Sequence, residues 1–74
     1  MQHDIFTAMV DRWPSSVVAR REVAKFSGGL VQPKTLANAD SAGKGVATRV
    51  EILGRVGYPA EALAEWLRSR SKKA

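Results

Sequence analysis

The chain contains no cysteine and only one histidine, His3. The absence of thiols excludes disulfide bonds, zinc fingers, iron–sulfur clusters and thiol catalysis. A lone histidine among scattered carboxylates offers no pair of nucleophile and base. We therefore expect neither an enzyme nor a cofactor. His3 beside Asp4 would bind a metal ion only adventitiously.

Long apolar runs are also absent, and none approaches the roughly 20 residues that a membrane-spanning helix needs. The first four residues lack the basic and apolar regions of a secretory signal. The sequence therefore predicts a cytoplasmic protein without a membrane segment.

Acidic residues are few. Twelve Lys and Arg face seven Asp and Glu, which gives a formal net charge of +5 in 74 residues. This excess favours an anionic partner. Nucleic acid is the first candidate, and an acidic protein surface or anionic lipid is the second. The length allows a single domain, and a chain this short buries only about 60% of its unfolded surface.

Helix signals dominate the first half of the chain. From Asp4 to Arg12, apolar side chains recur four residues apart, which predicts a short amphipathic helix ended by Trp13–Pro14. A second helix is predicted from Ala19 to Ser27, with Gly28–Gly29 at its end. A third is predicted to begin at Pro33 and to end at Gly43.

The hydrophobic period changes after Gly45. Alternation in Thr48–Ile52 predicts a half-buried strand, and Val56–Tyr58 follows a turn as a short return strand. Pro59 then opens a last helix with an apolar stripe at spacings of three and four residues. The predicted fold is mainly α with a small β-hairpin: a winged helix-turn-helix after a short N-terminal helix. The sequence predicts three segments: a helical extension over residues 1–16, a winged helix-turn-helix domain for DNA binding over 17–70, and a basic tail over 71–74.

Four segments resemble the small MerR-like winged helix-turn-helix proteins, a group that includes phage excisionases and prophage regulators. They are Val18–Phe26 for the first helix, Pro33–Leu36 for the second, Arg49–Tyr58 for the wing and Pro59–Leu67 for the closing helix. The likeness covers about residues 18 to 70. It implies binding to double-stranded DNA, for transcription regulation or for control of phage recombination.

Three groups of side chains are candidates for contact with DNA. In the predicted second helix, Lys34, Asn38 and Ser41 share the face opposite Leu36, and lysine and asparagine suit base edges. Thr35 suits a phosphate at the helix start. Cations elsewhere complete the set: Arg20 and Arg21 on the first helix, Arg55 at the hairpin turn, and Arg49 on the strand before it. The alternative for each of these residues is ordinary solvated surface; we favour base contact for Lys34, Asn38 and Ser41 and a wing contact for Arg55.

The predicted core consists of apolar residues spaced along these elements: Val23, Phe26, Leu36, Val50, Ile52, Val56, Leu63, Trp66 and Leu67. Tyr58 is expected to direct its hydroxyl outward. Asp40 lies on the inward half of its helix, and we expect it to accept hydrogen bonds from backbone or an arginine.

The first hypothesis is a sequence-specific protein for double-stranded DNA. The alternative is a protein-interaction module on the same fold, which would bind a partner or a second copy through Ile5, Met9 and Trp13. Burial of that apolar face within its own domain would make it structural, and exposure would favour interaction.

Overall fold

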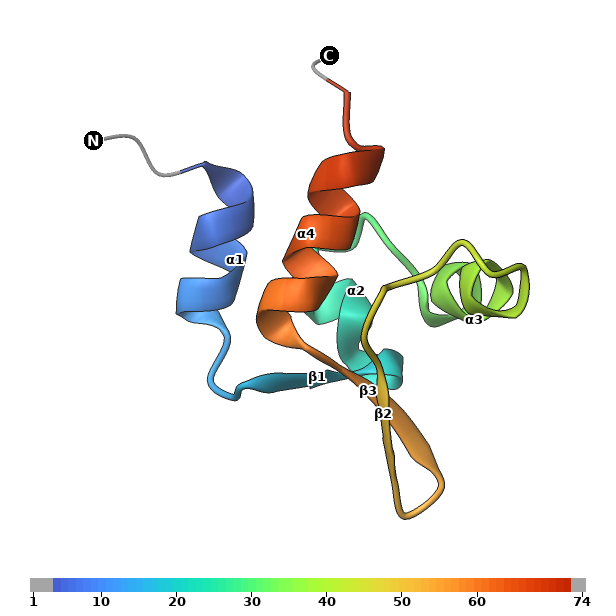
Figure 1. The fold of residues 1–74 in the computed structure, drawn as a ribbon. Coiled ribbons are helices and arrows are strands. Elements are labelled where there is room, and N and C mark those ends of the chain that lie inside the picture. The colour runs from blue at the N-terminus through green and yellow to red at the C-terminus, as the bar shows by residue number, and fades with distance from the viewer. Residues whose placement is uncertain (1–3, 73–74) are drawn as a thin grey trace.

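The computed structural model describes residues 4–72, and these form four α-helices, one 3₁₀ helix and a three-stranded antiparallel sheet. The elements are α1 Ile5–Arg12, β1 Val17–Ala19, η1 Arg20–Glu22, α2 Val23–Phe26, α3 Pro33–Ser41, β2 Val50–Ile52, β3 Arg55–Pro59 and α4 Ala60–Arg70. Helices α1 and α4 lie side by side, α3 lies apart from them, and the β2–β3 hairpin projects from the body (Figure 1). No helix within the described range is long and apolar enough to cross a membrane.

The helices and the hairpin confirm the coarse prediction of a mainly α domain with a small hairpin. The sheet differs, because β1 adds a third strand and β3 lies between β1 and β2. Val18 pairs with Tyr58, and Ala19 pairs with Gly57. The prediction of a helix starting at Ala19 is therefore wrong at its start. The β-branched Val17 and Val18 extend the chain along β3, and the helical conformation begins only at η1.

Helix α1 begins at a side-chain cap. Asp4 accepts a hydrogen bond from the Thr7 backbone N–H at 2.8 Å, and its carboxylate also pairs with Arg68 of α4. These contacts lower the pKa of Asp4 from 3.8 to about 2, with the hydrogen bond from Arg68 as the largest cause. The cap thus fixes both the start of α1 and its contact with α4.

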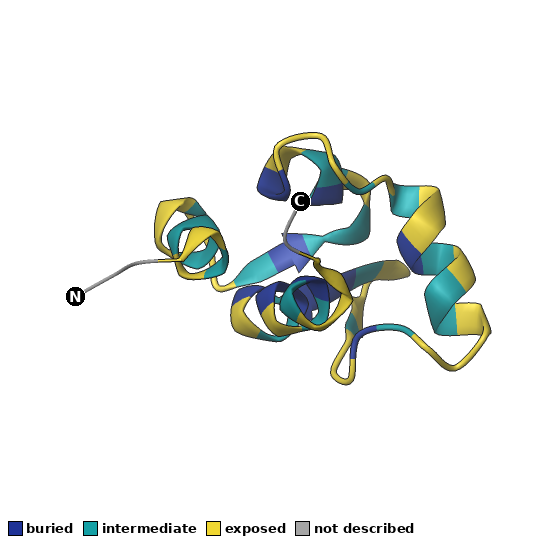
Figure 2. Cartoon of the chain, turned by 90° about the horizontal axis from the view of Figure 1, so that it is seen from above, coloured by how far each residue is buried: buried dark blue, intermediate teal, exposed yellow. Residues whose placement is uncertain are grey.

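The core lies between the inner face of the sheet and the helices, as the buried segments in Figure 2 show. Five predicted members are buried there: Val23, Phe26, Leu36, Leu63 and Leu67. Val18, Val46, Tyr58, Ala60 and Ala64 complete the core and were not predicted. A fully buried Val or Leu contributes about 1.5–3 kcal/mol relative to an exposed one.

One core prediction is wrong and three others hold only in part. Ile52 is 60% exposed, because its side chain lines an open hollow beside Val50 and Leu53. Val50 and Val56 are half-buried. Trp66 is also only half-buried, and its indole N–H donates to the Lys44 carbonyl at 2.9 Å. Trp66 therefore holds the loop after α3 against α4 and does not lie inside the core.

The turn between α2 and α3 is held by a buried serine. Ser27 is 3% exposed, and its hydroxyl accepts from the Val31 N–H at 3.0 Å. Gly28 and Gly29 have φ values of +69° and +89°, a conformation that costs glycine little. The Gly29 N–H donates to the Ala24 carbonyl at 2.6 Å. The glycine pair ends α2 as the sequence predicts.

Candidate nucleic-acid interface

The outer face of α3 presents the three polar side chains that the sequence places there. Lys34, Asn38 and Ser41 are all exposed, whereas Leu36 is fully buried on the opposite side. Pro33 occupies the first turn, and the Gln32 side chain makes no capping hydrogen bond. Since Leu36 is the one buried residue of α3, the helix leaves most of its surface to solvent.

Asp40 anchors α3 to the rest of the domain. Its side chain is 4% exposed and accepts hydrogen bonds from Arg20 Nη2 and from the Tyr58 hydroxyl, both at 2.6 Å. Arg49 approaches the same carboxylate at 3.7 Å. The expectation that Asp40 accepts from an arginine is confirmed. We name Asp40, Arg20, Tyr58 and Arg49 the Asp40 network.

Tyr58 corrects a prediction. Its hydroxyl points inward, the residue is fully buried, and the oxygen accepts from Arg20 Nε at 2.9 Å while it donates to Asp40. Burial and the Asp40 carboxylate raise the pKa of Tyr58 above its ordinary value. The sequence contained a signal for this. Tyr58 follows Val56 by two residues, so a strand places it on the same face as that predicted core residue. An inward Asp40 carboxylate also needs a hydrogen-bond donor.

Charge balance within the network favours the ionised carboxylate. Burial acts to raise the pKa of Asp40, but the hydrogen bonds from Tyr58 and Arg20 outweigh it and hold the pKa below the ordinary value. Hydrogen bonding to Tyr58 is the largest cause that raises the pKa of Arg20. The ionised groups tie α3 to η1 and to β3, so the angle between α3 and the hairpin depends on them.

Three arginines predicted as site residues lie around one hollow. Arg20 and Arg21 come from η1 and Arg55 from the start of β3, and together with Pro33 at the start of α3 they line a space of about 280 Å³. Arg21 and Arg55 are exposed and make no ion pair within residues 4–72. We call this feature the arginine hollow. It brings cations of η1 and of the β2–β3 hairpin to one place.

Thr35 and Arg49 lie outside the arginine hollow. Thr35 is exposed, but it lines a different hollow together with Leu30 and Trp66. Arg49 has a half-exposed side chain, 53% accessible, and is engaged with Asp40. Its position supports a structural role at least as well as a DNA contact.

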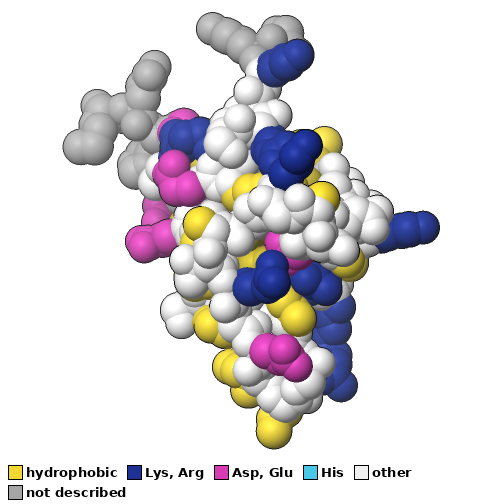
Figure 3. All heavy atoms as spheres, turned by 45° about the vertical axis from the view of Figure 1, so that its right-hand side comes forward, with side chains coloured by type: hydrophobic (Ala, Val, Ile, Leu, Met, Phe, Trp, Pro, Cys, Tyr) yellow, Lys and Arg dark blue, Asp and Glu magenta, His cyan; other side chains and the backbone are white. Residues whose placement is uncertain are grey.

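The surface charge is uneven. Figure 3 shows Lys and Arg side chains gathered at the centre and along the edge formed by α3 and the hairpin, with most acidic side chains on the α1 side. Four of the acidic residues belong to α1 and α4 or to the α1 cap: Asp4, Asp11, Glu61 and Glu65. The side with α3 and the hairpin is therefore the more favourable one for an anion.

Within residues 4–72, no group of three or more His, Cys, Asp and Glu side chains is placed to hold a metal ion. His3 lies outside the described residues, as does the end of the basic tail.

Comparison of the chain with protein-family models, with curated proteins and with solved structures found no match. The resemblance to MerR-like proteins therefore remains a prediction from the sequence.

Proposed function

We propose that this protein binds double-stranded DNA as a winged helix-turn-helix, with α3 in the major groove and the β2–β3 hairpin as the wing. The arginine hollow is the observation that carries the proposal. Three cations from two elements lie beside the start of α3, where a phosphate would meet guanidinium groups and the helix N-terminus together.

The outer face of α3 supplies the base contacts in this proposal. Lys34 can donate to guanine O6 and N7, and Asn38 can pair in a bidentate manner with adenine. Ser41 can reach either kind of base. All three are exposed and lie on the face opposite Leu36. Phosphate contacts would set the position of the protein, and the α3 side chains would read sequence.

The biological role would be transcription regulation or control of phage recombination, as the resemblance implies. Neither role needs a cofactor or a reaction. One small domain reads a short site, so useful specificity requires several copies or a partner on the DNA.

The alternative hypothesis, a protein-interaction module, needs an exposed apolar face on the N-terminal helix, and part of that face is not exposed. Met9 and Trp13 are half-buried against the core, and the Trp13 indole stacks edge-on with Phe26 at 5.6 Å between ring centroids. Ile5 remains 62% exposed. By the criterion of burial, α1 serves chiefly to cover α4, so we prefer the DNA-binding proposal.

Titration of duplex DNA at two salt concentrations tests the proposal. If Lys34, Arg21 and Arg55, which form no ion pair within residues 4–72, each neutralise one phosphate, log K should fall against log salt with a slope of about −3. A rise from roughly 50 to 200 mM salt should then weaken binding by about 50-fold. Binding that does not respond to salt would reject the proposal.

Paired variants separate the interface from mere net charge. Arg21→Ala removes a cation of the arginine hollow, and Arg12→Ala removes an exposed cation of α1. Both variants lose one positive charge, but only Arg21→Ala should flatten the salt slope, by about one. Equal effects would mean that net charge, and not this site, attracts the DNA.

Asn38→Ala tests whether α3 reads sequence. On a duplex enriched from a random pool by the protein itself, the variant should lose about 1–3 kcal/mol, concentrated at one base pair. Its affinity for random DNA should change little, because an amide releases no counterions. Equal losses on both DNAs would show that α3 only positions the protein.

A further inference from the structure

The tip of the hairpin holds a leucine that folding of a single chain does not explain. Leu53 has φ +53° and is followed by Gly54 at φ +77°, and the leucine is 96% exposed. A two-residue turn with positive φ at both positions favours Asn-Gly, and a bulky apolar residue there is an outlier. An outlier of this kind points to a function for the side chain.

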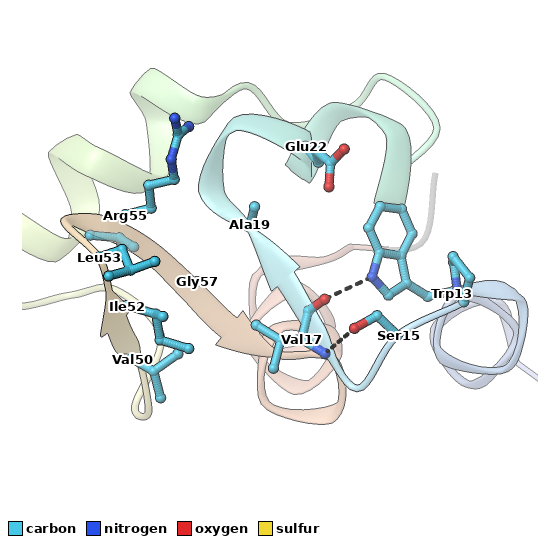
Figure 4. Close-up of a pocket in the computed structure, with 12 residues that line it drawn as sticks. Trp13, Ser15, Val17, Ala19, Glu22, Val50, Ile52, Leu53, Arg55 and Gly57 are labelled. Atoms are coloured by element: carbon cyan, nitrogen blue, oxygen red, sulfur yellow. Dashed lines mark hydrogen bonds between the residues drawn. The ribbon is translucent and has the colours of Figure 1, made fainter.

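Leu53 borders an apolar groove on the outer face of the sheet. The groove measures about 430 Å³. Val17, Ala19 and Gly57 form its floor, and among residues 4–72 no helix is drawn across this face (Figure 4). Trp13 stands on one side, and Val50, Ile52 and Leu53 stand on the other. Ile52 and Leu53, at 60% and 96% exposure, therefore extend one continuous apolar surface.

The two sides of the groove carry opposite charges. Glu22 lies on the side of Trp13, and Arg55 lies on the side of Ile52 and Leu53 (Figure 4). Neither forms an ion pair within the described range. With one acidic and one basic residue in its lining, this face can meet its own copy without repulsion.

We propose that a second copy of this chain docks on this face about a two-fold axis that exchanges the two sides of the groove. Trp13 then packs against the Ile52 and Leu53 side chains of the other copy, and Glu22 faces its Arg55. A two-fold interface must be complementary to itself, and the arrangement of apolar and charged residues fulfils that requirement. The dimer also covers the apolar side chains Val50 and Ile52 of β2.

A second copy fits this face better than nucleic acid does. Glu22 would repel a phosphate backbone, whereas a homodimer interface is characteristically apolar at its centre. The proposal is separate from DNA binding, although Arg55 borders both sites. Its guanidinium has five donors, enough for a carboxylate and a phosphate together.

Sedimentation equilibrium over a wide range of protein concentrations tests the proposal. The wild-type chain should pass from the mass of one chain to twice that mass. Leu53→Asn, which suits the turn, should fold at least as well in a thermal melt and raise the dimer dissociation constant by about 10- to 100-fold. The control Leu30→Asn removes another leucine, 81% exposed and outside the groove, and should leave dimerisation unchanged.

Charge exchange tests the two-fold arrangement itself. Glu22→Arg and Arg55→Glu should each weaken the dimer, and the double variant should restore it, because the pair forms again with reversed signs. The double variant should still bind DNA more weakly, since the hollow loses Arg55. Dimerisation can therefore be separated from the proposed function.

Two results would overturn the proposal. One is a wild-type chain that stays monomeric at every concentration; if its DNA affinity then falls with Leu53→Asn, Leu53 belongs to the DNA interface. The other is a Leu53→Asn variant that dimerises like the wild type.

Discussion

Tyr58→Phe is the sharpest test of how α3 is held. The change removes one oxygen and keeps the aromatic ring in the core. That oxygen donates to Asp40 at 2.6 Å and accepts from Arg20 at 2.9 Å. A hydrogen bond to a charged group contributes about 1.5–3 kcal/mol. Because Arg20 still contacts Asp40 directly, we expect a net loss of about 2–3 kcal/mol.

The size of this loss makes it easy to measure. A chain of 74 residues has a free energy of unfolding of about 4–11 kcal/mol, so the variant loses a large share of it. The melting temperature should fall by about 10–20 °C. In urea the midpoint should fall while the slope stays constant, since the folded state buries almost the same surface.

Arg49→Ala is the matched control for Tyr58→Phe. It also touches the Asp40 network, but at 3.7 Å and from a side chain that is 53% exposed, so it should cost less than about 1 kcal/mol. A Tyr58→Phe protein that melts like the wild type would refute the reasoning. Equal losses in the two variants would refute the ranking of the contacts.

Three further predictions concern stability. Trp66→Ala should lower the free energy of unfolding by about 2 kcal/mol, less than a core aromatic would, since Trp66 is half-buried; a thermal melt measures this. Gly45→Ala should lower the free energy of unfolding, measured in urea, by about 1–3 kcal/mol, because the new Cβ would collide with the Asp40 carboxylate. The folded-state pKa values of Asp4 (about 2) and Asp40 are lowered, so their stabilisation is complete above about pH 4 and is lost as the pH falls toward 2. The urea midpoint should fall over that range, and Asp40→Asn should flatten the dependence.

Local signals in the sequence account for most element boundaries. The Asp4 cap, the Gly28–Gly29 pair and Pro33 each act on the residues beside them, so the ends of α1, α2 and α3 were predictable. The third strand was not, because the pairing of Val18 with Tyr58 joins residues far apart in the chain. The alternation of apolar and charged residues that marks β2 as a strand likewise does not show whether another element covers Ile52.

The candidate site, like the fold, was predictable from the sequence only in part. Helical geometry of 100° per residue was enough to place Lys34 and Asn38 on one exposed face. It was not enough to show that Arg20 and Arg55 approach each other, since that depends on how the hairpin folds back on η1. It also could not show that Arg20 is engaged by Asp40 and Tyr58.

The attachment of α3 has a consequence for its motion. One buried leucine and one ionic network hold this helix, whereas α4 buries four residues along its length. Local opening should therefore release α3 well before the domain unfolds as a whole. Its backbone amides should exchange with deuterium faster than those of α4. A ligand that binds α3 should slow the exchange of the α3 amides selectively. The helix that presents Lys34 and Asn38 would then be ordered fully only when it is bound, and part of the binding free energy would be spent on fixing its orientation.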